Sequence, residues 1–150
     1  IIVNRKRFKN LEFFAQSASH PDLSVSAAVL PYRGANAFVP GDKLEYGQFT
    51  VDAILDENMN VYKEMHEWIK SATINKFVPS GKINATDEDA TTYDVSLLIL
   101  SSHNNVIDTI RYKDAFPISL GNISFQSTAD AVQYITFPVT FAFTTFTISD

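Results

Sequence analysis

Two short stretches carry side chains that could do chemistry in a suitable arrangement. His66-Glu67-Trp68-Ile69-Lys70 begins like the zinc-protease motif, in which two histidines four residues apart share one helical face and bind the metal. Lys70 stands where the second histidine is needed, so no zinc site is predicted here. The acidic run Asp87–Asp89 could begin a calcium loop, but Thr92 and Leu98 occupy the places of the turn glycine and the closing glutamate. We interpret it as a solvated loop.

Other catalytic patterns are absent from the sequence. It contains no Gly-x-Ser-x-Gly elbow, no glycine loop for phosphate and no dinucleotide fingerprint. It contains no cysteine, which excludes thiol nucleophiles, zinc-thiolate sites and disulfides. A carboxylate pair assembled by the fold, such as one involving Asp52 or Asp94, stays open, although nothing in the spacing favours it. An enzyme is the class that we least expect, and we predict no catalytic residue, cofactor or metal.

Length and charge narrow the class further. The chain has 150 residues, enough for one domain over residues 1–150 that buries about 70% of its unfolded surface without a disulfide or metal. Its 12 basic and 17 acidic residues give a formal net charge of −5, which argues against a surface that grips nucleic-acid phosphates. The sequence has no run of eighteen apolar residues, so we expect no membrane-spanning helix.

The last segment, Gln133–Ile148, gives the clearest structural signal. Its apolar residues alternate with small or polar ones, which is typical of a strand with one buried face. The buried face is predicted to hold Ile135, Phe137, Val139, Phe141 and Phe143, and the outer face Thr136, Pro138, Thr140, Ala142 and Thr144. A strand of this length would far exceed the usual five or six residues, so we expect it to extend beyond its own domain. The uncharged outer face suits a channel lining or a protein neighbour.

The remaining elements are predicted to be strands around one helix. Val61, Met65, Trp68 and Ala72 recur with helical spacing, which predicts a helix over about residues 58–72 with Trp68 in the core. Strands are expected at Leu11–Phe14, Ser24–Leu30, Leu44–Leu55, Tyr93–Leu100, Val106–Lys113 and, with a break, Phe116–Phe125. The predicted fold is therefore mainly β, an antiparallel β-sandwich or barrel with one flanking α-helix.

The segment Pro31–Lys43 contains two prolines and two glycines, which predicts a long loop or an irregular hairpin. Loops of this length are usually functional or disordered, and the apolar side chains of Tyr32, Phe38 and Val39 argue against disorder. We therefore expect the segment to make contact with another molecule.

Several of these patterns together resemble the tail tube proteins of contractile-tailed bacteriophages. They include Pro31 closing a strand, Gly41-Asp42-Lys43, Phe49–Ala53, the Asp56-Glu57-Asn58 turn and a helix that ends in Glu67-Trp68. The closing segments Phe116–Gly121 and Ile135–Phe141 resemble the same family, which includes related baseplate proteins that initiate or cap the tube. The likeness runs from about Arg7 to Phe146.

The resemblance implies a structural virion protein that is assembled in the host cytoplasm. It would form hexameric rings that stack into a hollow tube, with sheath and baseplate or tape-measure proteins as further partners and no membrane. DNA would pass through without specific binding, because a lining without basic side chains does not attract phosphates. Thr136, Thr140 and Thr144 are the predicted lumen residues; Tyr32, Arg33, Phe38, Val39, Asp42 and Lys43 are the predicted ring-stacking residues.

Other functions remain as alternatives. The same fold would serve a baseplate tube-initiator or cap protein, or the hexameric tube protein of a type VI secretion system. A different class is a monomeric β-sandwich that binds carbohydrate or protein. Such a module would expose aromatic residues on loops, and Tyr32 and Phe38 are the candidates.

Overall fold

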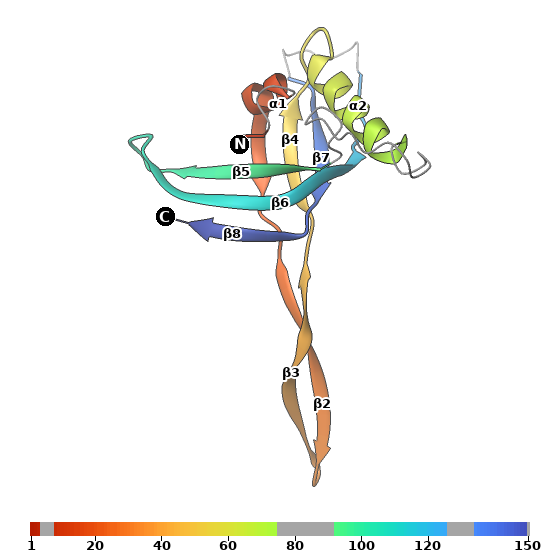
Figure 1. Cartoon of the computed structure of the whole chain (residues 1–150), viewed down its shortest axis with the longest axis vertical. Helices are drawn as coiled ribbons and strands as arrows, with labels where there is room; N and C mark the ends of the chain where they lie inside the picture. Colours follow the sequence, from red (N-terminus) through yellow and green to blue (C-terminus); the bar gives the residue numbers. More distant parts are fainter. Residues whose placement is uncertain (4–7, 75–91, 126–133, 150) are drawn as a thin grey trace, which may run out of the picture.

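A computed structural model describes residues 1–3, 8–74, 92–125 and 134–149 of the chain. These residues form a body made of a curled sheet and two helices, from which a long hairpin projects (Figure 1). The helices are α1 (Lys9–Phe14) and α2 (Asn60–Ile74). The strands are β1 (Ala15–Ser19), β2 (Leu23–Tyr32), β3 (Ala35–Tyr46), β4 (Phe49–Ile54), β5 (Tyr93–Leu100), β6 (Val106–Leu120), β7 (Thr136–Ala142) and β8 (Thr145–Ser149).

One six-stranded antiparallel sheet forms the body, in the order β1-β4-β7-β6-β5 with β8 also on β6. The sheet has two arms, which the long strand β6 joins. The first half of β6 pairs with β5 and β8 in one arm, and its second half pairs with β7, next to β4 and β1, in the other. Near the change of partner, Asp114 has a left-handed φ of 54°, and its backbone N–H donates to the Asp94 carboxylate at 3.3 Å. The sheet curls into a half-barrel, which confirms the predicted mainly β, antiparallel fold class.

The core lies between the two arms of the sheet and helix α2. Helix α2 turns one stripe inward, and its Trp68 stacks on Phe8 with ring centroids 4.3 Å apart and contacts Phe141 of β7 at 5.8 Å. The fully buried large side chains are Leu11, Phe49, Val51, Val61, Met65, Trp68, Val95, Tyr112, Phe137, Val139 and Phe141. Burying each of them stabilises the fold by roughly 1.5–3 kcal/mol as an upper value.

The prediction of one strand over Gln133–Ile148 is wrong. Strand β7 ends at Ala142, and the backbone N–H of Thr144 donates to the Lys113 carbonyl at 3.0 Å where the chain turns. Strand β8 then joins the other arm, with Ile148 opposite Ile110. The bend is favoured because it buries part of Phe146 in the core, whereas a straight strand would carry this ring away from it. The element that extends beyond the body is the β2–β3 hairpin.

Two other expected strands also differ from the structure. Leu11–Phe14 lies in helix α1, because the spacing of Phe8 and Leu11 places both side chains in the core beside α2. Leu44–Leu55 is divided at Gly47 and Gln48 into the end of β3 and all of β4. Leu11–Phe14 is largely apolar and Leu44–Leu55 does alternate, but neither pattern shows where the chain leaves one element and pairs with another strand.

The other expected elements are found with shifted ends. The helix predicted at 58–72 is α2, and the carboxylate of Asp56 accepts hydrogen bonds from the Val61 N–H at 3.4 Å and from the side chain of Asn60 at 2.8 Å at its start. The strand predicted at Tyr93–Leu100 is β5. The strand predicted at Val106–Lys113 continues through the segment expected to be broken, as far as Leu120.

Candidate assembly surfaces

The outer face of the arm formed by β1, β4, β7 and β6 carries a row of hydroxyl groups. Residues paired directly across antiparallel strands point to the same face. Ser19 of β1 pairs with Thr50 of β4. Thr50 pairs in turn with Thr140 of β7, and Thr140 with Ser119 of β6. We call these four residues the hydroxyl row; it crosses the whole arm.

The rest of this face is nearly uncharged. The carboxylate of Asp52 accepts a hydrogen bond from Ser17 Oγ at 2.6 Å, so its charge is partly satisfied within the face. The outward residues of β4 and β7 are Thr50, Asp52, Ile54, Thr136, Pro138, Thr140 and Ala142, and they include one acid and no base. The phosphate backbone of a nucleic acid lying beside these two strands would meet no basic side chain from them.

The structure places two of the three predicted lumen residues on this face. Thr136 is exposed and Thr140 is half-buried, and both point away from the core. Thr144 lies in the bend between β7 and β8, so it does not continue the alternation of β7. Sequence reasoning assigned no role here to Ser19 or Ser119, because only the strand pairing brings them beside the threonines.

The predicted core residues divide into two groups. Trp68, Phe137, Val139 and Phe141 are fully or almost fully buried. Ile135 precedes β7 and Phe143 lies in the bend, and both are only partly buried. Phe143 instead packs beside Tyr112, with ring centroids 5.1 Å apart.

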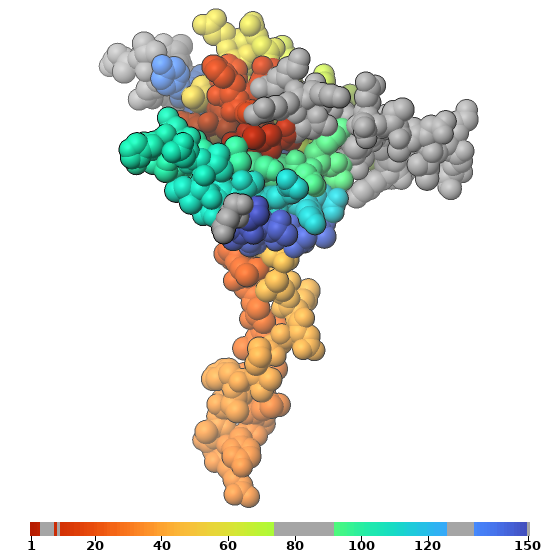
Figure 2. Space-filling view, turned by 60° about the vertical axis from the view of Figure 1, so that its left-hand side comes forward, coloured from red at the N-terminus to blue at the C-terminus, as the bar shows by residue number. Residues whose placement is uncertain are grey.

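The β2–β3 hairpin exposes apolar side chains on both of its faces. Val29 and Phe38 are paired on one face, while the pair of Ala28 with Val39 and the pair of Leu30 with Ala37 lie on the other. Figure 2 shows the hairpin standing clear of the body, in orange. Its large exposed apolar residues are Leu23, Val25, Val29, Leu30, Tyr32, Phe38, Val39 and Leu44. Two uncovered apolar faces on one ribbon are typical of a segment that other chains cover.

The predicted ring-stacking residues lie along this hairpin. Arg33 and Gly34 form its two-residue turn, with φ values of 36° and 87° that suit a type I′ turn. Tyr32, beside the turn, is 68% exposed, and Phe38 is 72% exposed. Of the two predicted alternatives, the structure therefore forms the hairpin, irregular at one bulge, and not the long loop.

Apart from Arg33 in the turn, the charged residues of the hairpin lie at or beside a bulge. Between the pairs Val25–Leu44 and Ala27–Pro40, β2 has one residue, Ser26, whereas β3 has three, Gly41, Asp42 and Lys43. Lys43 pairs with Glu45 of the same strand at 3.2 Å, and both side chains are mostly exposed. Such an exposed pair adds little stability but gives the bulge a local charge pattern.

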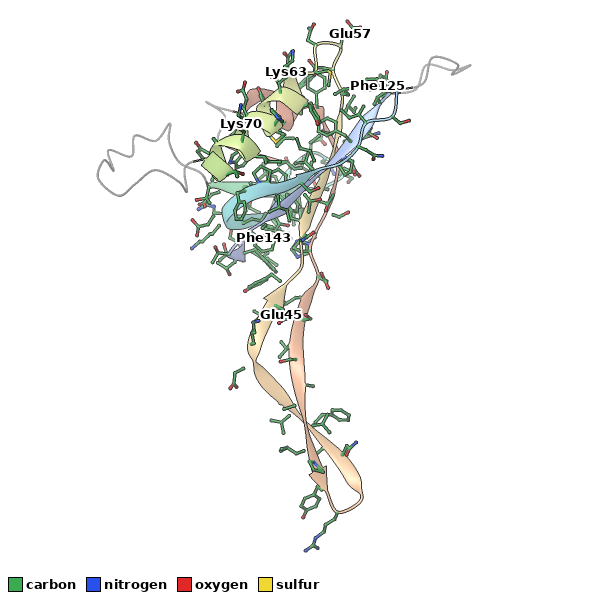
Figure 3. All side chains as sticks on the ribbon, turned by 90° about the vertical axis from the view of Figure 1, so that its right-hand side faces the viewer. Glu45, Glu57, Lys63, Lys70, Phe125 and Phe143 are labelled. Atoms are coloured by element: carbon green, nitrogen blue, oxygen red, sulfur yellow. The ribbon has the colours of Figure 1, made fainter. Side chains whose placement is uncertain are left out.

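Helix α2 presents a polar surface on the side away from the core. Its charged residues Lys63 and Lys70 point outward, with Glu57 on the preceding turn (Figure 3). A shallow groove of about 380 Å³ lies here, lined by Met59, Tyr62, Lys63, His66 and Glu67. Nearer to α1, Glu64 accepts a hydrogen bond from Asn10 at 2.6 Å, and burial raises the pKa of its carboxyl above the ordinary 4.5.

Among the described residues, the structure does not bring together the groups that the sequence offered for chemistry. Within the described ranges, no three histidine, aspartate or glutamate residues are grouped to hold a metal. The carboxylate of Asp52 accepts a hydrogen bond from Ser17 and that of Asp94 from the Asp114 backbone, and no described hydrogen bond joins either of them to another carboxylate. Asp87–Asp89 lies outside the described residues. No helix in the described parts of the chain is long and apolar enough to cross a membrane.

The described residues thus form a curled antiparallel sheet with a nearly uncharged outer face and a projecting hairpin that exposes apolar side chains. The sequence matches the family model for the phage tail tube protein over residues 3–149, so the chain belongs to that family. This confirms the family resemblance and the predicted role of a tail tube protein. No curated protein matches the sequence.

Solved structures share the fold at low sequence identity. The cap of the anti-feeding prophage superposes with a TM-score of 0.63 at 20% identity, over 90% of this chain and 79% of that chain. The sheath-tube complex of the PVC extracellular contractile injection system gives 0.63 at 18% identity, over 90% and 80%. Hcp1 from Flavobacterium johnsoniae gives 0.52 at 12% identity, over 89% and 84%.

Proposed function

We propose that copies of this chain form hexameric rings that stack into the hollow tube of a contractile phage tail. The observation that carries this proposal is the β2–β3 hairpin with two uncovered apolar faces. An isolated two-stranded hairpin is at best marginally stable in water, and covering its apolar residues is favourable. The adjacent ring of the tube supplies that cover. Membership of the tail tube family supports this arrangement.

The stacking contact uses the two halves of the hairpin differently. At the far end, Tyr32, Phe38 and Val39 are the apolar anchors, with Arg33 in the turn. Nearer the body, Asp42 and Lys43 at the bulge meet charges of the adjacent ring. Exposed charge pairs add little energy, but a mismatched pair penalises a misrotated ring.

The outer face of the sheet lines the lumen of the tube. Thr136, Thr140 and the rest of the hydroxyl row present hydroxyl groups there, and Asp52 is the one charge on the two central strands. DNA passes along this lining without specific binding, because no counterions are released by basic side chains. Thr144 is placed at the end of this lining, in the bend after β7.

Helix α2 then lies on the outside of the tube. It packs on the side of the sheet that holds Phe137 and Phe141, opposite to the hydroxyl row, so its polar surface faces a sheath. A chain of similar fold was solved in a sheath-tube complex, which supports a sheath as a partner. Baseplate and tape-measure proteins are the further partners, assembly takes place in the host cytoplasm, and the protein has no enzymatic activity.

A shortened hairpin tests the proposal. Replacing Val29–Phe38 with Asn-Gly keeps the paired residues Ala28 and Val39 beside a two-residue turn. Circular dichroism should show the β-sheet of the body unchanged, and negative-stain electron microscopy should show rings where the parent chain gives long tubes. Tubes of normal length from the shortened chain would contradict the stacking role. Single rings from the parent chain itself would identify a cap protein.

A further inference from the structure

The projecting hairpin is joined to the body by two short connections. One runs from His20 to Asp22, between β1 and β2, and the other is Gly47 and Gln48, between β3 and β4. The backbone N–H of Gly47 donates to the carbonyl of Asp22 at 2.9 Å. This hydrogen bond holds the two connections to each other, but it does not fix the hairpin against the sheet.

His20, on the first connection, reaches the body with its side chain. Its Nδ1 lies 2.7 Å from the hydroxyl of Tyr112 on β6. Its ring also meets Phe146 of β8 edge to face, with centroids 4.9 Å apart and planes 80° apart. Its ring also lies 6.0 Å from the ring of Tyr112, so it is attached to two strands of the body by one hydrogen bond and two aromatic contacts.

Tyr46, at the end of β3, makes the matching attachment on the second side. Its ring lies 5.7 Å from Phe143 and 5.5 Å from Phe146, measured between centroids. Its hydroxyl lies 3.3 Å from Oγ1 of Thr145. Each side of the hairpin base therefore has its own contact with the β6 and β8 part of the sheet.

The anchor of the first attachment is rigid. Tyr112 is fully buried and its ring stacks on Phe49 with centroids 4.4 Å apart. Burial raises the pKa of Tyr112 to about 12, so its hydroxyl keeps its proton at neutral pH. The hydroxyl can act as donor or as acceptor toward Nδ1 of His20, depending on the tautomer of the imidazole.

We propose that His20 and Tyr46 form a latch that fixes the direction of the β2–β3 hairpin in the single subunit. A ribbon attached on both sides cannot swing about its base, whereas two short connections alone would let it turn. The hairpin is thereby ordered before it meets a partner, which lowers the entropic cost of binding. The latch also makes the hairpin direction depend on β8, which supplies Phe146 and Thr145. This inference concerns the free subunit and goes beyond the proposed tube, so either can fail without the other.

Distances between spin labels test the latch. The natural chain has no cysteine, so Ala37→Cys near the hairpin tip and Lys70→Cys on α2 give one labelled pair. Labelled chain is mixed with an excess of unlabelled chain, so that distances between copies do not contribute. We expect one narrow distance distribution for this chain. Adding His20→Ala and Tyr46→Ala should at least double its width or add a second distance.

A matched control removes the same residue types elsewhere. His103 and Tyr134 are both exposed and lie outside the hairpin base, so His103→Ala with Tyr134→Ala should leave the distribution narrow. Circular dichroism checks folding, and the single variants His20→Ala and Tyr46→Ala replace the double variant if that does not fold. A distribution as narrow as the parent's in the folded double variant, or in both single variants, would overturn the latch. A broad distribution in the parent would overturn it as well.

Discussion

Phe49 and Tyr112 stack with ring centroids 4.4 Å apart and planes 26° apart, although their strands are not neighbours in the sheet. Phe49 belongs to β4 in one arm, and Tyr112 to the half of β6 that pairs with β5 and β8. The stack therefore holds the two arms face to face. The core thus supports the curl of the sheet, and core substitutions should destabilise both arms together.

The first prediction concerns Phe141, which is 1% exposed beside Trp68 and Phe49. Phe141→Ala should lower the free energy of unfolding by about 3–5 kcal/mol, because it leaves a cavity between the sheet and α2. Thr140→Ser, at the neighbouring position on the outer face, should change it by less than about 0.5 kcal/mol. Denaturant titration measures both. Equal losses in the two variants would show that the faces of β7 are assigned wrongly.

The second prediction follows from the buried phenol of Tyr112, whose pKa is raised from 10.0 to about 12. The unfolded chain loses this proton near pH 10 and the folded chain keeps it until about pH 12. The stability that Tyr112 contributes is therefore present below pH 10 and is lost as the pH rises to 12, by at most about 1.4 kcal/mol per pH unit. In Tyr112→Phe, the free energy of unfolding should therefore fall less steeply between pH 10 and pH 12. A slope unchanged in the variant would assign the loss to other groups.

The third prediction concerns Glu64, whose Oε2 is buried and has no hydrogen-bond partner among the described residues. Burial raises the pKa of this carboxyl, so its contribution to stability is present below pH 4.5 and is lost as the pH rises through the folded pKa. Glu64→Gln cannot ionise, so its stability relative to the parent should rise between pH 4 and pH 7. Thermal unfolding at a series of pH values compares the variant with the parent.

The fourth prediction concerns Gly121, whose backbone N–H donates to the Pro138 carbonyl at 2.7 Å. A Cβ on Gly121 would overlap the Pro138 ring, which is rigid and cannot move aside as a flexible side chain would. Gly121→Ala should therefore cost about 1–3 kcal/mol of unfolding free energy. Asn122→Ala, at the exposed next position, should be near neutral. If Gly121→Ala is as stable as Asn122→Ala, the backbone there can shift freely.

Local patterns in the sequence were enough for the fold class and for several elements. The helical spacing of Val61, Met65 and Trp68 predicts α2, and the alternation in 135–143 predicts which side chains of β7 face the core. These signals report the environment of one segment at a time. They succeed where a segment keeps one partner from end to end.

The failures lie where a segment changes its partner. The alternation of 133–148 changes phase at Thr144-Thr145, from apolar odd positions up to Phe143 to apolar Phe146 and Ile148. A change of phase alone does not show that β7 ends at Ala142 and that β8 pairs with another strand. The sequence does not predict that strand pairing continues to Tyr32 and Ala35, because Arg33-Gly34 is an unusual type I′ turn and because Pro31 and Pro40 discourage a strand prediction. Likewise, Ser19 and Ser119 join the hydroxyl row only through pairing between distant segments. Local sequence patterns do not predict which distant segments pair with each other.

The last prediction tests the proposed lumen through its charge. Thr140 lies at the centre of the hydroxyl row, half-buried, with its side chain on the outer face of β7. Thr140→Lys should leave the fold intact, because a lysine stem can run along the sheet while its ammonium group stays in water. Each copy then presents a cation to the lumen, so assembled tubes should bind short DNA roughly tenfold more tightly at low salt, and the gain should fade as salt is raised. Thr140→Gln adds similar bulk without charge and should bind DNA as weakly as the parent. Filter binding over a series of salt concentrations gives both affinities, and equal affinities for the lysine and glutamine tubes would show that β7 does not line the channel.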